Sequence, residues 1–79
     1  MGDAPSEVLT DGRHLVCSDA DRLHSFAASI GLRRRWFQAG RCPHYDLTTP
    51  RAVRRAIAAG ARLMETRDLV RALKAREKT

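Results

Sequence analysis

Cysteines and long apolar runs are both scarce in this chain of 79 residues. The two cysteines, Cys17 and Cys42, are too few for a disulfide-dense secreted scaffold. No apolar run approaches the roughly 20 residues that span a bilayer, and no signal-peptide core follows Met1. We therefore expect a cytoplasmic protein without a membrane partner, in which both thiols are reduced.

Sequence motifs of the common enzyme classes are also missing. The chain contains no nucleophile elbow, P-loop, glycine-rich dinucleotide loop or zincin motif. It has no helix-turn-helix pattern either, so sequence-specific reading of DNA is not expected. These absences favour a protein that is not an enzyme and needs no cofactor, although a divalent metal is compatible with its residues.

Lysine is scarce as well, because the fifteen basic residues are all arginine except Lys74 and Lys78. The net charge is +6. Since the planar guanidinium pairs with phosphate or carboxylate at two points, this composition suggests an anionic partner: a nucleotide, a nucleic acid or an acidic protein surface. The alternative is a solvated basic surface without a dedicated partner.

The length fits one domain. We expect a single small domain over residues 7–75, with flexible tails at residues 1–6 and 76–79. A chain this short cannot enclose a large cavity, so a sizeable ligand has to lie in a surface groove or between two subunits. A homodimer is therefore a reasonable expectation.

The clearest predicted element is a helix over residues 18–30. Ser18 is suited to cap it, with Asp21 completing an approximate capping box, and Gly31 ends it. Its buried stripe follows the helical period: Leu23, Phe26, Ala27 and Ile30.

Short strands are predicted over residues 7–10, 14–17, 42–47 and 61–65. Two further helices are predicted, one starting at Thr49-Pro50 and ending at Gly60, the other capped by Thr66 and running from Arg67 to about Ala75. The second half thus reads strand–helix–strand–helix, with a right-handed crossover between parallel strands. The expected class is α/β or α+β: a three- to four-stranded sheet with about three helices in a single layer.

Residues 7–73 carry a series of short motifs in a specific order: His14–Asp19, Leu23–Ala27, Ile30–Leu32 leading into Arg35–Gln38, His44–Leu47 and Gly60–Ala61. In this order and spacing the chain resembles a family of small bacterial and phage proteins, domain of unknown function 4031. That family opens with a strand ending in Asp and a longer loop before the first His. Here the loop is reduced to Gly12-Arg13, which implies a more open or altered site. The resemblance implies a fold and a set of polar residues, and no activity.

Five polar residues fall at strand ends or at the start of the first helix: Asp11, His14, Asp19, His44 and Asp46. In open α/β sheets such ends converge on the crevice where ligands bind. Histidine and carboxylate together suit a divalent metal, or acid–base chemistry on a phosphoester. The structural alternative is that Asp19 stabilises the helix, Asp46 orients His44, and His14 bonds to backbone.

Two weaker patterns remain. One is a four-ligand zinc site made by His14, Cys17, Cys42 and His44, whose spacings are not those of a standard finger. The other is Arg33–Phe37, where arginines beside aromatics suit a single-stranded nucleic acid. In a chain with four aromatic residues, Trp36 and Phe37 are the expected core anchors instead.

The leading hypothesis is a non-enzymatic module that binds an anionic ligand. Its expected ligand-binding residues are His14, Asp19, Arg35, Arg41, His44 and Asp46. The alternative is a small metal-dependent hydrolase or phosphoesterase, with His14, His44 and Asp46 as metal ligands. A third reading is an adaptor that binds a partner protein through its helices.

Overall fold

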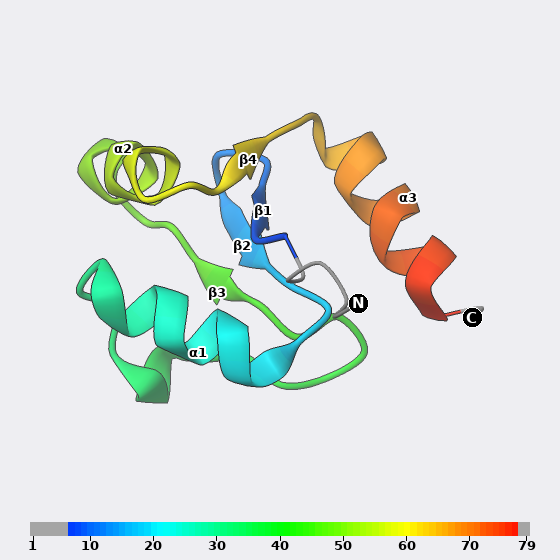
Figure 1. Cartoon of the computed structure of the whole chain (residues 1–79), viewed down its shortest axis with the longest axis horizontal. Helices are drawn as coiled ribbons and strands as arrows, with labels where there is room; N and C mark the ends of the chain where they lie inside the picture. Colours follow the sequence, from blue (N-terminus) through cyan, green and yellow to red (C-terminus); the bar gives the residue numbers. More distant parts are fainter. Residues whose placement is uncertain (1–6, 78–79) are drawn as a thin grey trace, which may run out of the picture.

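The computed structural model describes residues 7–77 (Figure 1). Residues 1–6 and 78–79, which belong to the two expected tails, lie outside the described residues. Residues 7–77 form three α-helices and a four-stranded mixed sheet, which confirms the expected fold class. Over residues 7–77, no helix combines the length and the apolar character needed to cross a bilayer.

The sheet has the order β3-β2-β1-β4. Its strands are short: β1 (Leu9–Thr10), β2 (His14–Val16), β3 (Tyr45–Asp46) and β4 (Arg62–Leu63). β1 and β2 form an antiparallel hairpin, β3 pairs antiparallel with β2, and β4 pairs parallel with β1. β3 and β4 therefore run in the same direction at opposite edges, and the predicted crossover spans the whole sheet.

Helix α1 (Ala20–Ser29) begins two residues later than predicted. Its cap is Asp19, whose side chain accepts a hydrogen bond from the Arg22 backbone N–H at 3.2 Å. Ser18 is therefore not the capping residue. Helix α2 (Pro50–Ala58) starts as predicted, with Thr49 as its cap and proline in the first turn.

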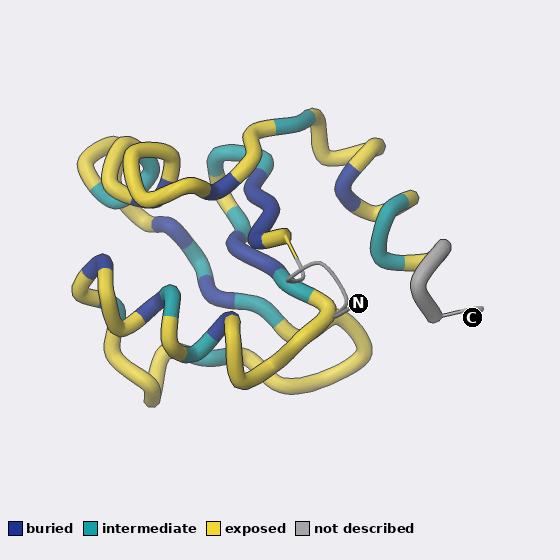
Figure 2. The backbone as a smooth tube through the Cα atoms, viewed as in Figure 1, coloured by how far each residue is buried: buried dark blue, intermediate teal, exposed yellow. Residues whose placement is uncertain are grey.

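Helix α3 (Thr66–Glu77) lies on the other face of the sheet from α1 and α2 (Figures 1 and 2). Val8 and Leu15 belong to the core under α1 and α2, whereas Leu9 and Val16 pack against Leu69 of α3. The helices thus form two layers, and the expected single layer is wrong. The reason is visible in β1 and β2, where consecutive residues are buried: Leu9 and Thr10 on β1, Leu15 and Val16 on β2. A strand covered on both faces lacks the alternation of buried and exposed residues that a single layer of helices would produce.

The segment between α1 and β3 contains a 3-10 turn, η1 (Arg34–Trp36). Beyond it, Gln38 pairs with His44 in an isolated antiparallel bridge. Phe37 packs, as expected, against the core under α1 and α2, which we call the main core. Trp36, in contrast, keeps 47% of its surface exposed. The expected core role of Trp36 is therefore wrong, because the 3-10 turn directs it outward.

Candidate metal centre

Strands β2 and β3 bring three of the predicted site residues together. His14 on β2 lies directly opposite Asp46 on β3. His44 precedes Asp46 by two residues, so both side chains lie on the same face of the sheet. The His14 and His44 rings meet edge to face with centroids 5.3 Å apart. Each of the three residues offers a ligand atom, and these atoms lie within 4.8 Å of one another.

Asp11, in the β1–β2 turn, fixes the ring of His14. One carboxylate oxygen accepts the backbone N–H groups of Arg13 and His14, at 2.9 and 2.8 Å. The other accepts Nδ1 of His14 at 3.0 Å and the Thr66 hydroxyl at 2.7 Å. Because a carboxylate only accepts, Nδ1 of His14 has to carry the proton, which leaves the Nε2 lone pair for a metal.

The protonation of Asp11 is strongly biased. Burial of its carboxyl, which has no exposed side-chain surface, raises the pKa, but hydrogen bonds from His14, Thr66 and Arg13 outweigh that effect. Together they hold the pKa of Asp11 well below its usual range. Asp11 is therefore an ionised acceptor under all physiological conditions, and it orients His14 without a competing tautomer.

His44 is oriented by the backbone. Its Nδ1 lies 2.7 Å from the carbonyl oxygen of Cys42, which again requires a proton on Nδ1. Its Nε2 lies 3.2 Å from Oδ1 of Asp46, whose second oxygen accepts the Gln38 amide. A lone pair facing a carboxylate is repulsive, so this pair requires either a second proton on the ring or a cation between the two groups.

The distances suit a cation after a small contraction. Two ligand atoms bound to one ion at about 2.1 Å and separated by about 100° lie about 3.2 Å apart, as do Nε2 of His44 and Oδ1 of Asp46. The 4.8 Å limit for the whole cluster is wider than the spacing of adjacent ligands. The Asp46 side chain is 41% exposed and its partner Gln38 is exposed as well, so a small shift of this carboxylate can close the difference.

Solvent reaches the cluster. The exposed side-chain fractions are 40% for His14, 24% for His44 and 41% for Asp46. Three protein ligands with an open side are typical of catalytic and ligand-binding metal sites, whereas structural zinc sites are closed by four. The arrangement is therefore one in which an ion keeps positions for water or for an exogenous ligand.

Pockets lie on both sides of the cluster. A pocket of about 200 Å³ separates it from α3 and is walled by apolar side chains together with His14 and His44: Val16, Leu69, Val70 and Leu73. A second pocket, of about 420 Å³, includes Asp46 and Gln38 with Arg35, Trp36, Leu32 and Thr48. Asp46 thus belongs both to the cluster and to the wall of the second pocket.

The other three predicted ligand-binding residues lie at three different places. Arg35 lines the pocket that contains Asp46. Arg41 lines a different pocket, of about 280 Å³, beside Cys42. Asp19 caps α1 and lies outside the cluster, so the geometry shows the structural alternative for this residue, stabilisation of the helix.

The four-ligand zinc site is not assembled. Among the side chains that the structure describes, the grouped ligand atoms come from His14, His44 and Asp46, and neither cysteine belongs to them. Cys17 is half-buried against the main core, and Cys42 is exposed. The third histidine, His24, lies on the α1 side, where Nδ1 is 2.8 Å from the Tyr45 hydroxyl.

Gln38 and Thr66 are supporting residues that sequence reasoning missed. Gln38 holds Asp46, and Thr66 holds Asp11, which in turn holds His14. Thr66 reads from sequence only as a helix start, because its contact with Asp11 spans 55 residues. The Asp-Gly turn followed by a histidine was the one local signal that could have assigned Asp11 its orienting role.

The family model described as protein of unknown function (DUF4031) matches residues 8–76 of the chain, in agreement with the resemblance of the motifs. Neither the curated proteins nor the solved structures contain a match.

Proposed function

We propose that this chain, which belongs to the DUF4031 family, binds one divalent metal ion through His14, His44 and Asp46 and uses it to hold an anionic ligand. The observation that carries this proposal is the contact of each Nδ1 with an oxygen that only accepts: Oδ2 of Asp11 for His14 and the Cys42 carbonyl oxygen for His44. A proton on each Nδ1 satisfies these contacts and leaves Nε2 of both rings to coordinate an ion.

The ligand set favours a transition metal. Two imidazoles and one carboxylate suit Zn²⁺, Fe²⁺, Mn²⁺ or Co²⁺, whereas Mg²⁺ and Ca²⁺ prefer oxygen ligands alone. The carboxylate of Asp46 then neutralises part of the ion's charge, and the open positions retain a net positive charge. An anionic oxygen from phosphate or carboxylate is the complementary ligand.

The charge around the site supports an anion. The chain carries +6 overall, and Arg35 shares a pocket with Asp46. Such a field raises the local concentration of anions and orients them towards the ion. The proposal thus unites the two leading readings of the sequence in one site. The exposed thiol of Cys42 lines the pocket beside the cluster and suits the reducing cytoplasm.

Hydrolysis of a phosphoester is a second candidate function, favoured by the apolar pocket beside the ion. A metal ion can lower the pKa of its bound water to about 7, which supplies hydroxide at neutral pH. A water on an ion held by the cluster would lie beside the apolar walls made by Val16, Leu69 and Leu73, which would lower the dielectric around it. The ion would supply the activated water, and the cluster residues would hold the ion.

Metal binding can be tested directly by native mass spectrometry of protein purified without chelator, followed by titration with Zn²⁺ and Mn²⁺. We expect one ion per chain, and at least a hundredfold weaker binding in His14→Ala and His44→Ala. His24→Gln is the matched control, because it removes a histidine from the opposite face and keeps a partner for Tyr45. A folded wild type that takes up neither ion overturns the proposal.

The metal-loaded protein then separates the two functions. Metal-dependent cleavage of bis(p-nitrophenyl) phosphate that disappears in His44→Ala supports hydrolysis. Metal-dependent binding of inorganic phosphate without turnover supports an anion-binding module.

A further inference from the structure

Charge is segregated along the chain. Between Asp21 and Glu65 the sequence has a single acidic residue, Asp46, although arginine recurs throughout that stretch. Asp46 is itself engaged by His44 and Gln38. The middle of the chain therefore offers no acidic side chain to neutralise its arginines locally.

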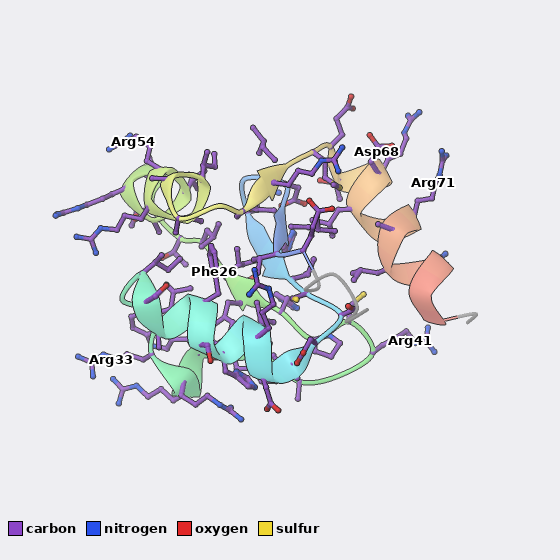
Figure 3. All side chains as sticks on the ribbon, viewed as in Figure 1. Phe26, Arg33, Arg41, Arg54, Asp68 and Arg71 are labelled. Carbon is purple, nitrogen blue, oxygen red and sulfur yellow. The ribbon has the colours of Figure 1, made fainter. Side chains whose placement is uncertain are left out.

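Six of these arginines form what we call the arginine face, at the start of η1 and on α2: Arg33, Arg34, Arg35, Arg51, Arg54 and Arg55. All six are exposed, and among the residues that the structure describes none of them makes an ion pair. Figure 3 shows Arg33 and Arg54 pointing outward on the side of the molecule away from α3. Arg71 lies on α3 itself.

The two halves of the arginine face are adjacent in space. A Cβ placed on Gly31, just before η1, would lie 3.4 Å from a guanidinium nitrogen of Arg55 on α2. Thr48, two residues before α2, lines the same pocket as Arg35. The arginines of η1 and of α2 therefore border one continuous surface.

Trp36 lies within this surface. It is 47% exposed in a chain with one tryptophan and three other aromatic residues, so its indole is not used for core packing. It lines the pocket of about 420 Å³ with Arg35 and Asp46, which falls in the size range of small-ligand pockets. An accessible indole beside cations is the combination that stacks nucleobases and neutralises phosphates.

We propose that the arginine face and Trp36 bind a single-stranded nucleic acid, with one base stacked on the indole and the flanking phosphates on Arg35 and the α2 arginines. A single strand is required because duplex bases are already stacked and cannot present a face to Trp36. A polymer is favoured over a mononucleotide because the arginines extend along α2, beyond the pocket.

This inference goes beyond the metal proposal and does not depend on it, because the arginine face binds phosphate without an ion. The two are connected in space through Asp46, which belongs to both the metal cluster and the Trp36 pocket. A strand held on Trp36 would lead one of its phosphates towards the metal centre.

Trp36 itself is the probe, since it is the chain's sole tryptophan. Its fluorescence should be quenched when a twelve-residue oligothymidylate is titrated in the presence of chelator. The logarithm of the association constant should fall linearly with the logarithm of the salt concentration. The slope should be about −0.7 per phosphate neutralised, with at least three phosphates engaged. A labelled oligonucleotide measures the variants by anisotropy: Trp36→Leu should bind at least fivefold more weakly.

A charge-matched pair of double variants tests the location of the surface. Arg35→Ala/Arg51→Ala should weaken binding at least tenfold and reduce the salt slope, whereas Arg67→Ala/Arg71→Ala on α3 should leave both nearly unchanged. Equal losses in the two double variants would mean binding by net charge alone and overturn the proposal. So would unquenched Trp36 fluorescence, equally tight binding of a duplex, or thymidine monophosphate binding as tightly as the oligonucleotide. His44→Ala should retain oligonucleotide binding while losing metal, so that each proposal can fail alone.

Discussion

Replacing Asp11 by Asn tests the reasoning about His14 without changing the size of the side chain. The Asn oxygen can still accept the backbone N–H groups of Arg13 and His14, but its NH₂ then faces Nδ1 of His14 and the Thr66 hydroxyl. The opposite amide orientation would place NH₂ against two backbone N–H groups. The ring therefore has to accept from Asn at Nδ1 and carry its proton on Nε2, which blocks coordination.

The contacts of Asp11 set the size of the effect on stability and of the effect on metal affinity. Asp11 loses its role as a charged acceptor for the His14 ring and Thr66, and hydrogen bonds to charged groups contribute about 1.5–3 kcal/mol each. Since the reversed bond from Asn to the ring recovers part of this, we expect a net destabilisation of about 2 kcal/mol. Metal affinity should fall about 10- to 100-fold, the usual cost of removing the group that orients a metal-bound histidine.

Three measurements together check this prediction: urea denaturation, Zn²⁺ competition titration, and two-dimensional NMR of the ring nitrogens, which reports the tautomer. Thr66→Val is the matched control. It removes one hydrogen bond to Asp11 but keeps the carboxylate, so it should cost about 1 kcal/mol of stability and leave metal affinity unchanged. An Asp11→Asn protein with wild-type metal affinity and a proton on Nε2 would refute His14 as a ligand.

Two further predictions concern stability. The pKa of Asp11 is lower in the folded chain than in the unfolded chain, so its contribution to the free energy of unfolding is complete above about pH 4 and is lost as the pH falls towards the folded value. In acid titrations monitored by circular dichroism, Asp11→Asn should therefore lose stability less steeply than the wild type below pH 4. An unchanged profile would contradict this. Leu69→Ala should cost about 3 kcal/mol in urea denaturation, because Leu69 is the buried residue that anchors α3 to Leu9 and Val16. Val70→Ala, at an exposed neighbouring position, should cost less than 1 kcal/mol, and equal losses would show that α3 is not held by this contact.

The helices were the most predictable part of the fold because their signals are local. Thr49-Pro50 starts α2 at the expected place, and the periodic stripe containing Leu23 and Ala27 defines α1. Ser18 was predicted as the cap of α1 in place of Asp19 because two adjacent residues are both good caps. Thr66 was predicted as the cap of the last helix but is the first residue of α3. The placement of α3 on the opposite face of the sheet from α1 and α2 was not predictable in the same way, since it depends on which side of each short strand packs against α3.

The candidate site was predictable in composition but not in geometry. His14, His44 and Asp46 stood out as residue types that bind metals, and the pairing of β2 with β3 is what brings them together. No local signal specifies that pairing, because each strand has only two or three residues. Trp36 was assigned to the core because aromatic residues are usually buried, and only the 3-10 turn separates its direction from that of Phe37.

The pairing of β2 with β3 has a thermodynamic consequence. His14 and Asp46 face each other across two very short strands and are separated by a long stretch of chain, so few backbone hydrogen bonds hold this contact. An ion bound by both strands would cross-link them, and it would do so only in the folded state, where the ligands from β2 and β3 are close together. At a free concentration one hundred times its dissociation constant it would add about 2.7 kcal/mol to the folding free energy. For a domain this small, the fraction of folded chains would then follow the supply of the metal.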